Sequence, residues 1–572
     1  MGMLMNRSRL LATSALTLAL ALVLQSCDKP APQAEARPPF SIVEASIPDM
    51  QAAMADGRTT SRAVVAEFLM RMGMYEDMLN ASVSTNANAL AQADALDKER
   101  AAGKVRGPLH GIPVALKDNI MTKDDMPTSG GMLAFKYYKA PYDATLVANL
   151  KEAGAIIIAK STMSELAGWY GGGNRSGGYN GAAGQRYNPY DPRAAEVGKP
   201  ILDVAGSSSG VGVAANMWAG SVGTSTGGSI ESPSNANMLV GIRPSTGRIS
   251  RYGIVPLSLD QDTAGPMTKF VADAAIMLGA MEGAAVDPND PRTSECTPPP
   301  NRDYTAFLKA DALKGARIGI PRAGIYTAHK FPGKAPAFAG LKPDQLESME
   351  GAIAALKAAG AEIIDPVEIP SLVATEAVKN ISSHPICALT GVGEPDGEFC
   401  SDVVRYTMKR DFNPWLASLG EGAPVKTLKE FLAWNVAHQA DGAIRYGQER
   451  LERTEAVDLE KDKARYERNR AEDLVLTRAE GLDAALTANK LDALVFPGSS
   501  GSTFATKAGY PVVVVPYGLI ANDNPGAKGS PDKVKPFGFS FVGGHCEDPK
   551  MIGLAYAFEQ ATKKRVPSRY TP

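Results

Sequence analysis

Three short segments of this chain carry side chains that could perform covalent chemistry. Lys117 closes the apolar run Ile112–Leu116, where an ammonium group is costly to bury. Gly206–Gly210 reads Gly-Ser-Ser-Ser-Gly, and Gly223–Ile230 reads Gly-Thr-Ser-Thr-Gly-Gly-Ser-Ile. Taken singly, Lys117 could be a surface lysine at a strand end, which is common, and each Ser/Gly stretch is more often a flexible turn. The stretch between the two loops, VGVAANMWAGSV, is apolar, which indicates that both loops are held against a core.

These residue types favour a serine nucleophile with a lysine base. A hydroxyl is a weak nucleophile until a base removes its proton. Ser229 is followed by Ile-Glu, and no histidine lies near a Gly-x-Ser-x-Gly elbow, which disfavours a Ser-His-Asp hydrolase. Lysine is a base only when neutral, and burial favours the neutral form by lowering its pKa. Gly227 and Gly228 lack a Cβ, so backbone N–H groups near them can converge on one oxygen atom.

Cofactor and metal sites have weaker support. Gly210–Ala215 matches the Gly-x-Gly-x-x-Ala dinucleotide fingerprint, which requires a preceding strand and an acidic residue that ends another strand about 20 residues later. Here three serines precede the glycine, and Glu231 lies in a turn-rich stretch. The 5 histidines are scattered, and the chain has no Cys-x-x-Cys and no His-Glu-x-x-His. We therefore expect no cofactor and no catalytic metal.

The elements that must position these segments alternate between helix and strand. Thr145–Glu152 fits a helix, and Ala155–Ala159 and Val512–Pro516 are apolar runs typical of buried strands. This alternation is typical of βαβ units, so the predicted fold class is α/β with a largely parallel sheet. No linker composition interrupts residues 41–572, so we expect one large domain there, with a helical elaboration at about 300–485.

Composition narrows the possible partners. The 572 residues carry 60 Lys and Arg against 62 Asp and Glu, a net charge of −2. Such a chain has no strong basic field, so we expect no nucleic-acid partner.

The N-terminus has the pattern of a secretory signal. Arg7 and Arg9 precede the apolar run Leu10–Leu24, which ends in Leu-Gln-Ser-Cys at Cys27. This ending resembles a bacterial lipobox, in which the cysteine is lipidated, and an ordinary signal peptide with an incidental cysteine is the alternative. We expect a lipoprotein signal peptide at 1–26, a tether at 27–40 and a lipid anchor on the periplasmic face of a bacterial envelope. Asp28 favours the inner membrane.

An oxidising compartment would allow disulfides. Cys387 and Cys400 flank a turn-rich stretch, which predicts a bond between them, with two free buried thiols as the alternative.

Taken together, the segments resemble the amidase signature family of serine hydrolases. The resemblance spans essentially all of 41–572, and the matching stretches are Gly111–Asn119, Ala144–Ala167, Gly206–Ala215, Gly223–Gly253, Gln261–Met267, Leu491–Pro497 and Ala555–Thr562. It implies an α/β fold with a large mixed, mostly parallel β-sheet covered by helices. It also implies a Ser–cis-Ser–Lys triad with Ser229 as nucleophile, Ser207 as bridging serine and Lys117 as base. It also implies an oxyanion hole made by the backbone N–H groups of four residues, Thr226, Gly227, Gly228 and Ser229.

The chain departs from the family pattern in two places. Ser207 and Ser229 lie 22 residues apart where the family usually has 24, so a gap-free alignment would place Ala205 at the bridging position. We prefer a two-residue deletion after the intact Gly-Ser-Ser-Ser-Gly, with Ser208 as the reserve candidate. Ser225 also replaces a usual acidic residue.

The resemblance implies an amidase that cleaves a small carboxylic amide through an acyl-enzyme, with possible esterase activity. The tRNA-dependent amidotransferase branch is disfavoured, because an exported chain does not meet tRNA. The alternative is a non-catalytic binding protein of the envelope that has kept the fold. Trp169, Tyr170 and Gly171–Gly173 fit either a pocket lining or simple packing.

Overall fold

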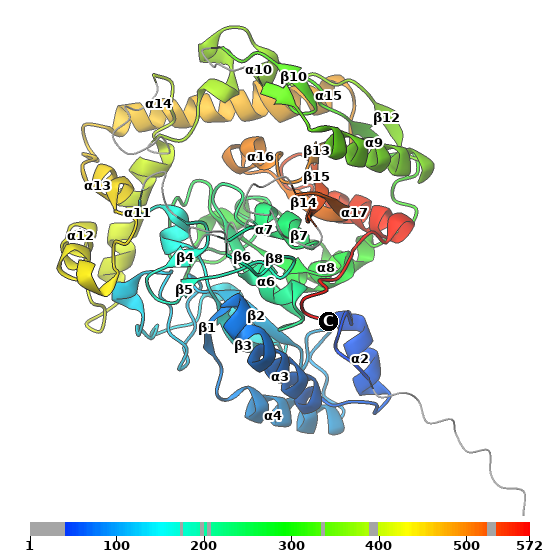
Figure 1. Cartoon of the computed structure of the whole chain (residues 1–572), viewed down its shortest axis with the longest axis vertical. Helices are drawn as coiled ribbons and strands as arrows, with labels where there is room; N and C mark the ends of the chain where they lie inside the picture. The colour runs from blue at the N-terminus through cyan, green and yellow to red at the C-terminus, as the bar shows by residue number, and fades with distance from the viewer. Residues whose placement is uncertain are drawn as a thin grey trace, which may run out of the picture. The chain divides into compact units, whose positions relative to one another are not determined.

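An 11-stranded β-sheet runs through the unit Ile42–Pro572 (Figure 1), with the strand order β1-β3-β2-β6-β8-β7-β14-β15-β13-β9-β12. The computed structural model describes residues 40–171, 176–194, 200–202, 208–332, 338–387, 398–522 and 533–572. The strands of this sheet are β1 (Ser82–Thr85), β2 (Pro113–Lys117), β3 (Ile156–Ser161), β6 (Gly220–Ser225), β7 (Val240–Arg243), β8 (Thr263–Thr268), β9 (Arg317–Gly319), β12 (Glu362–Ile364), β13 (Ala493–Pro497), β14 (Val512–Ala521) and β15 (Val534–Val542). Two small sheets pair β4 (Tyr179–Asn180) with β5 (Gly184–Gln185) and β10 (Thr327–His329) with β11 (Phe338–Gly340).

The sheet is mixed, which confirms the predicted fold class. Parallel pairing joins β2 to β3 and β6, and joins β9 to β12 and β13. The expected excess of parallel pairs is wrong, because the other neighbouring pairs, among them β14–β15 and β7–β8, are antiparallel. An apolar run such as Val512–Val515 indicates a strand buried on both faces, and such burial is compatible with either direction of pairing.

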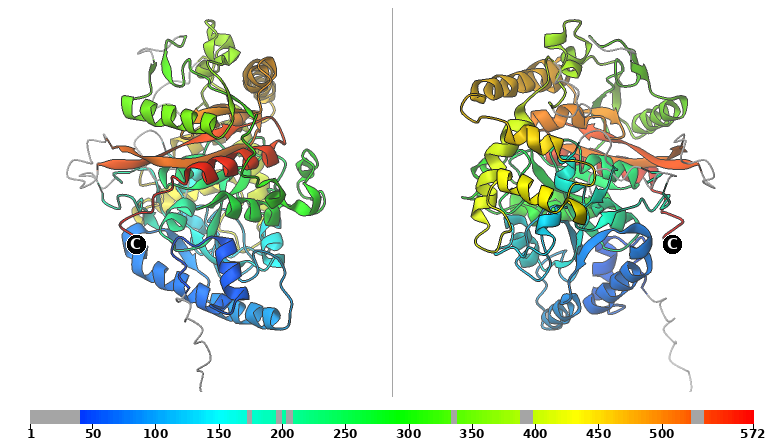
Figure 2. Two further views of the ribbon diagram at one scale, coloured as in Figure 1. Left: turned by 90° about the vertical axis from the view of Figure 1, so that its right-hand side faces the viewer. Right: turned by 60° about the vertical axis from the view of Figure 1, so that its left-hand side comes forward.

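Helices cover the sheet. The helices are α2 (Ile47–Ala55), α3 (Ser61–Leu79), α4 (Ala89–Ala101), α5 (Thr145–Glu152), α6 (Ser209–Ala214), α7 (Glu231–Ala236), α8 (Val271–Met281), α9 (Pro343–Ala358), α10 (Pro370–Val373), α11 (Val403–Ser418), α12 (Leu428–Ala437), α13 (Glu449–Glu455), α14 (Lys463–Leu474), α15 (Asp483–Ala488), α16 (Ser502–Ala508) and α17 (Asp548–Thr562). Helices α3 and α4 pack beside β2 and β3, α8 packs beside β6–β8, and α9 and α17 pack beside β14 (Figure 2). Side-chain caps begin several of them: Ser46 accepts from Asp49 N, and Thr60 from Ala63 N.

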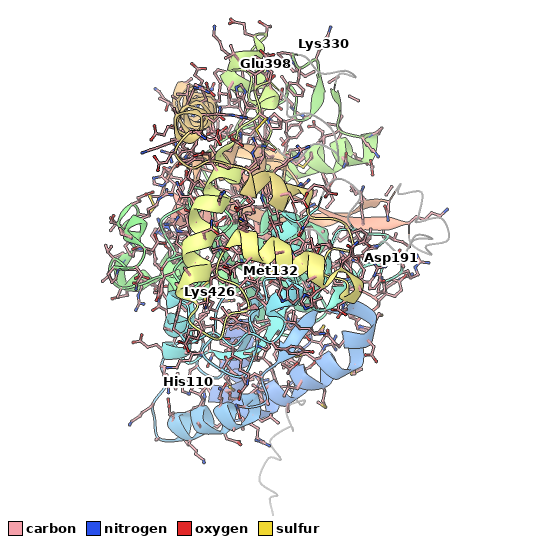
Figure 3. The ribbon with its side chains drawn as sticks, turned by 90° about the vertical axis from the view of Figure 1, so that its left-hand side faces the viewer. His110, Met132, Asp191, Lys330, Glu398 and Lys426 are labelled. Atoms are coloured by element: carbon pink, nitrogen blue, oxygen red, sulfur yellow. A yellow bond between two sulfur atoms is a disulfide. The ribbon has the colours of Figure 1, made fainter. Side chains whose placement is uncertain are left out.

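Helices α11–α15 form most of the predicted helical elaboration. A hydrophobic cluster joins α11 and α12 to the N-terminal third, with Met132 and Phe135 against Phe412, Trp415 and Phe431; Figure 3 shows Met132 beside the yellow helices. The ring centroids of Phe135 and Trp415 lie 5.9 Å apart. Because this cluster contains side chains from both parts of the chain, these helices share a core with the rest of the unit. Burying each such side chain stabilises the folded state by about 1.5–3 kcal/mol.

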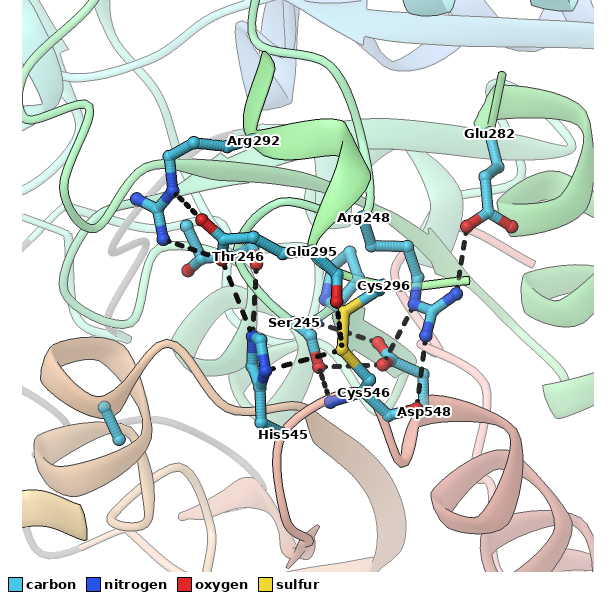
Figure 4. The surroundings of a disulfide bond; sticks show 12 residues. Ser245, Thr246, Arg248, Glu282, Arg292, Glu295, Cys296, His545, Cys546 and Asp548 are labelled. Atoms are coloured by element: carbon cyan, nitrogen blue, oxygen red, sulfur yellow. Dashed lines mark hydrogen bonds and ion pairs between the residues drawn. A yellow bond between two sulfur atoms is a disulfide. The ribbon is translucent and has the colours of Figure 1, made fainter. Parts of the chain in front are cut away.

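All four cysteines of the described chain are bonded. The Cys387–Cys400 disulfide confirms the predicted pair. The second bond, Cys296–Cys546, joins residues 250 positions apart and was not expected from the sequence (Figure 4). Beside it, Asp548 at the start of α17 accepts from Ser245 N at 2.8 Å and pairs with Arg248 at 3.0 Å, so a buried polar network backs the bond.

Across the part of the chain that the structure describes, no helix combines the length and the apolarity needed to span a bilayer.

Candidate active site

The strand register brings Lys117 and the loop that carries Ser229 to one edge of the sheet. Strand β2 runs parallel to β6, with Leu116 opposite Val222. Lys117 is the last residue of β2, and Ser229 follows the end of β6 by four residues. Because parallel strands end at the same edge, the two segments meet there although 112 positions separate Lys117 from Ser229 in the sequence.

Lys117 is held by Thr224, near the end of β6. Its Nζ donates to the backbone O of Thr224 at 3.0 Å and to Thr224 Oγ1 at 2.8 Å. Asn119 Nδ2 donates to the same hydroxyl oxygen at 3.1 Å. A neutral amine has two N–H donors and one lone pair. If Thr224 receives both donors, the lone pair stays free to accept a proton.

Burial and, to a smaller extent, the nearby Arg186 guanidinium lower the pKa of Lys117, and the Asp262 and Glu231 carboxylates oppose that shift, so that the pKa is lowered to about 7. Lys117 is fully buried, yet burial alone does not distinguish it. Lys160 and Lys269 are buried as well, and desolvation lowers the pKa of each to about 8. Its position beside the glycine-rich loop sets Lys117 apart.

The loop around Ser229 is accessible. Ser229 is half-buried and Gly227 is exposed, and a Cβ at Gly227 would meet open space. Gly228 has φ +112°, which L side chains rarely adopt, so this position requires glycine. The nucleophile position therefore lies on a turn that a ligand can approach closely.

Ser225 organises the amides of this loop. Its Oγ accepts from the backbone N of Gly228 at 3.0 Å and of Ser229 at 3.1 Å. Two of the four amides expected to form the oxyanion hole are thus bonded in this structure. The hydrogen bonds of the described residues include no acceptor for the amides of Thr226 and Gly227, which are left for a ligand oxygen.

A buried charge supports Ser225. Ser225 Oγ donates to Glu231 Oε2 at 2.9 Å, and Ile230 N donates to the same oxygen at 3.2 Å. Glu231 Oε1 lies 3.7 Å from Arg243 Nε, and both side chains are fully buried. The negative charge absent from position 225 is therefore supplied six residues later by Glu231.

The position of the bridging serine is described only in part, because the described residues resume at Ser208. Ser207 falls outside the described residues. Ser208, the reserve candidate, bonds Thr162, both through its backbone N, 2.8 Å from Thr162 O, and through its hydroxyl. Ser209 Oγ lies 2.8 Å from Ser161 Oγ. The two hydroxyls are thus bonded to the last residue of β3 and to the residue that follows it, and no described contact joins either to Lys117 or Ser229.

A cavity, here called the loop cavity, opens beside these residues. Asn119, Thr224 and Thr226 line it, together with Met163, Leu166, Ala167, Arg251, Ile254, Val255, Pro256, Leu257, Leu259, Asp262 and Thr263. Leu166 and Ala167 both have positive φ, 39° and 55°, a strained arrangement for non-glycine residues. Trp169 and Tyr170 are not among the lining residues. They are buried in the cluster with Phe412, which bears out the packing interpretation; of the glycine stretch beside them, only Gly171 is described.

Sequence reasoning missed four residues of the site: Thr224, Asn119, Glu231 and Asp262. Asn119 and Thr224 lie inside the motif stretches, where only their neighbours suggested chemistry. Asp262 accepts from the Thr226 hydroxyl and from the amides of Leu257 and Ser258. Glu231 could have been found from the sequence. It is a single carboxylate in an otherwise uncharged stretch, and such a carboxylate needs a buried partner.

Comparison with known proteins gives consistent matches. The family model described as Amidase matches residues 63–525. A probable amidase from Arabidopsis thaliana is 33% identical over 537 residues, covering 93% of this chain and 92% of the plant protein. The crystal structure of a peptide amidase from Stenotrophomonas maltophilia is 34% identical with a TM-score of 0.77, covering 93% of this chain and 100% of that one. A structure of the peptide amidase PAM with the competitive inhibitor chymostatin matches with a TM-score of 0.76, at 34% identity and the same coverage of both chains.

Proposed function

The chain belongs to the amidase family and hydrolyses C–N amide bonds, and from this premise we propose that it does so through an acyl-enzyme on Ser229. The observation that carries the proposal is the pair of hydrogen bonds from Lys117 to Thr224, which orients a buried lysine beside the nucleophile loop. The alternative of a non-catalytic binding protein is not favoured, because the amidase family model and the peptide amidase structures match most of the chain.

In the first step, neutral Lys117 takes a proton through the bridging serine, and Ser229 Oγ attacks the amide carbonyl. We assign the bridging role to Ser207, since the Ser208 hydroxyl is bonded to Thr162. A general base of this kind contributes about 10²- to 10⁴-fold in rate. Protonated Lys117 then returns the proton through the same serine to the leaving nitrogen.

The tetrahedral intermediate carries its negative charge on the former carbonyl oxygen. The amides of Thr226 and Gly227 are the donors that the loop leaves available, while Ser225 fixes the amides of Gly228 and Ser229. Oriented N–H donors stabilise such an oxyanion without reorganising during the reaction. Water then attacks the acyl-enzyme with the same base, which releases the acid and restores Ser229.

The peptide amidase relatives suggest the substrate class. We propose small carboxylic amides of peptide type, with esters as secondary substrates because an acyl-enzyme forms from either. Ammonia or amine release from a panel of peptide, aryl and fatty amides tests this, with Ser229→Ala as the control. Absence of turnover on the whole panel, together with no labelling by a fluorophosphonate probe, would sink the proposed function.

We further propose that Cys27 is lipidated and anchors the enzyme on the periplasmic face of a bacterial envelope, where Asp28 favours the inner membrane. Support comes from the sequence: the apolar run ends in Leu-Gln-Ser-Cys, with no acidic residue before Asp28. Expression of Cys27→Ala should give soluble or unprocessed protein. Normal maturation and membrane retention of that variant would contradict the anchor.

A further inference from the structure

We propose that helices α11 and α14 hold the nucleophile loop in its active conformation through Asp260, so that Arg410 and Tyr466 are positioning residues for amide hydrolysis. Both helices belong to the helical elaboration, and neither contains a residue of the triad. This inference rests on the proposed function, and it adds control of the oxyanion hole by a part of the chain that does not touch the substrate.

Thr226 connects the oxyanion hole to a neighbouring turn. Its backbone amide is one of the two proposed donors to the oxyanion, and its hydroxyl donates to Asp262 Oδ1. The other carboxylate oxygen of Asp262 accepts from Leu257 N at 2.9 Å and from Ser258 N at 2.8 Å. These bonds close a turn over residues 257–262, here called the Asp262 turn. Because the Thr226 side chain is tied to it, a shift of this turn would also move the Thr226 amide.

Helix α11 holds the Asp262 turn at two points. Thr407 and Asp411 lie four residues apart and therefore share one face of α11. The Thr407 hydroxyl donates to Ser258 Oγ at 2.8 Å, and both side chains are buried. Asp411 Oδ2 accepts from Leu259 N at 2.9 Å. The turn is therefore fixed to a helix of the elaboration as well as by its own hydrogen bonds.

Asp260, inside the same turn, joins it to both helices. Tyr466 Oη, on α14, donates to Asp260 Oδ2 at 2.7 Å, and Arg410 Nη2, on α11, donates to Oδ1 at 3.0 Å. Arg410 Nη1 also donates to the Tyr466 hydroxyl at 2.9 Å. Arg470 Nε, one helical turn beyond Tyr466, lies 3.8 Å from Asp260 Oδ2. Hydrogen bonds that involve a charged group are stronger than neutral ones, so this carboxylate is a firm anchor.

The Asp260 carboxylate depends on these donors, because its side chain is only 17% exposed. Desolvation raises the pKa of Asp260, but the Tyr466 hydroxyl and the Arg410 guanidinium outweigh that effect, and the pKa is lowered overall. Loss of one donor would leave a partly desolvated charge with less compensation. The Asp262 turn would then relax toward water.

Two further arginines hold the turn without α11 or α14. Arg251 and Arg292 both donate to Leu259 O. The turn therefore keeps part of its support when the Asp260 contacts are lost. We expect a partial loss of kcat, smaller than the loss of about 10²- to 10³-fold that follows removal of an oxyanion donor.

The test replaces the anchor and one of its donors. Asp260→Asn and Tyr466→Phe should each lower kcat about tenfold with little change in KM, because the oxyanion forms only in the transition state. Tyr406→Phe is the matched control. Tyr406 stacks on Tyr466 with ring centroids 4.3 Å apart, but its hydroxyl donates to Leu459 O and not to the turn. Equal kcat in Tyr466→Phe and Tyr406→Phe would overturn the inference.

A double-mutant cycle separates positioning from a general loss of stability. Thr226→Val removes the hydroxyl that links the nucleophile loop to Asp262. In that background, Tyr466→Phe should lower kcat less than about twofold, while its effect on Tm should stay the same. Strictly additive losses of kcat would contradict the inference and leave the amidase function standing. If the wild type hydrolyses no amide, the proposed function fails first, and the inference fails with it.

Discussion

Lys117 and Thr224 share two hydrogen bonds, although they lie 107 residues apart in the sequence. Thr224 is near the end of β6, the strand that leads directly into the loop of Ser229. The base is therefore anchored to the same strand that positions the nucleophile, so a shift of this strand carries both groups together.

Replacing Lys117 with Met should remove the base while keeping an apolar stem of similar length. We expect kcat to fall by about 10²- to 10⁴-fold. In the wild type, activity should rise with pH and level off above about 7, because the pKa of Lys117 is lowered to about 7 and only the neutral amine accepts a proton. Lys269→Met is the control, since Lys269 is also buried but follows the far end of β8, opposite the start of β6. Near-native kcat in Lys117→Met would refute the triad.

Lys117 should also lower the free energy of unfolding at neutral pH. The pKa of Lys117 is lowered from 10.5 to about 7 on folding, so between these values the unfolded chain binds the extra proton. The contribution of Lys117 to the free energy of unfolding therefore rises with pH from about 7 to about 10.5. Lys117→Met lacks this penalty and should melt a few degrees higher at pH 7. Melting curves of both proteins at pH 7 and pH 10 check this, and a gap that widens toward pH 10 would contradict it.

Three serine variants should rank in severity. Ser229→Ala should abolish turnover and labelling by a fluorophosphonate probe, because no acyl-enzyme can form. Ser207→Ala should be intermediate. Ser208→Ala should affect kcat least, since its hydroxyl is bonded to Thr162. If Ser208→Ala lowers kcat more than Ser207→Ala does in correctly folded protein, then Ser208 is the bridging serine and not Ser207.

Ser225 and Glu231 should behave as one unit. Ser225→Ala removes the acceptor for two loop amides, so kcat should fall by about 10- to 100-fold with little change in KM. Ser225→Asp alone should be as harmful, because it places a second carboxylate beside buried Glu231, whereas Ser225→Asp combined with Glu231→Gln should recover activity. Steady-state kinetics of the double-mutant cycle measure this coupling, and strictly additive effects would exclude it.

The sequence predicted the strands and helices that carry apolar periodicity. Thr145–Glu152 is a helix with the predicted bounds. Strand direction could not be read in the same way, because apolar runs such as Val512–Val515 look alike in parallel and antiparallel sheets. The Cys296–Cys546 bond could not be predicted either, because sequence spacing does not indicate which cysteines pair when they lie 250 positions apart.

Motif position was a better guide to the site than residue chemistry. A buried lysine at a strand end seemed unusual, yet Lys160 is buried in the neighbouring strand β3. The hydrogen bonds that define the loop run between Ser225, Glu231 and backbone amides. Such contacts depend on the turn geometry, which a linear pattern does not specify.

The two disulfides should differ in their effect on stability. Closing a loop of 13 positions stabilises by about 3 kcal/mol in the chain-entropy model, and closing a loop of 250 positions by about 5.5 kcal/mol. The pair Cys296→Ser with Cys546→Ser should therefore lower Tm more than the pair Cys387→Ser with Cys400→Ser. Thiol titration of denatured, non-reduced protein should find none of these four thiols free.

The Cys296–Cys546 bond turns nearly half of the chain into a covalent ring. This ring contains β9–β15 and the whole of α9–α16. A protease that cuts once inside it, for example in a surface loop between α12 and α13, leaves two fragments that stay joined through sulfur. An enzyme exposed outside the cytoplasm would thus survive a single cut as one molecule, and only a reducing agent would let the pieces separate.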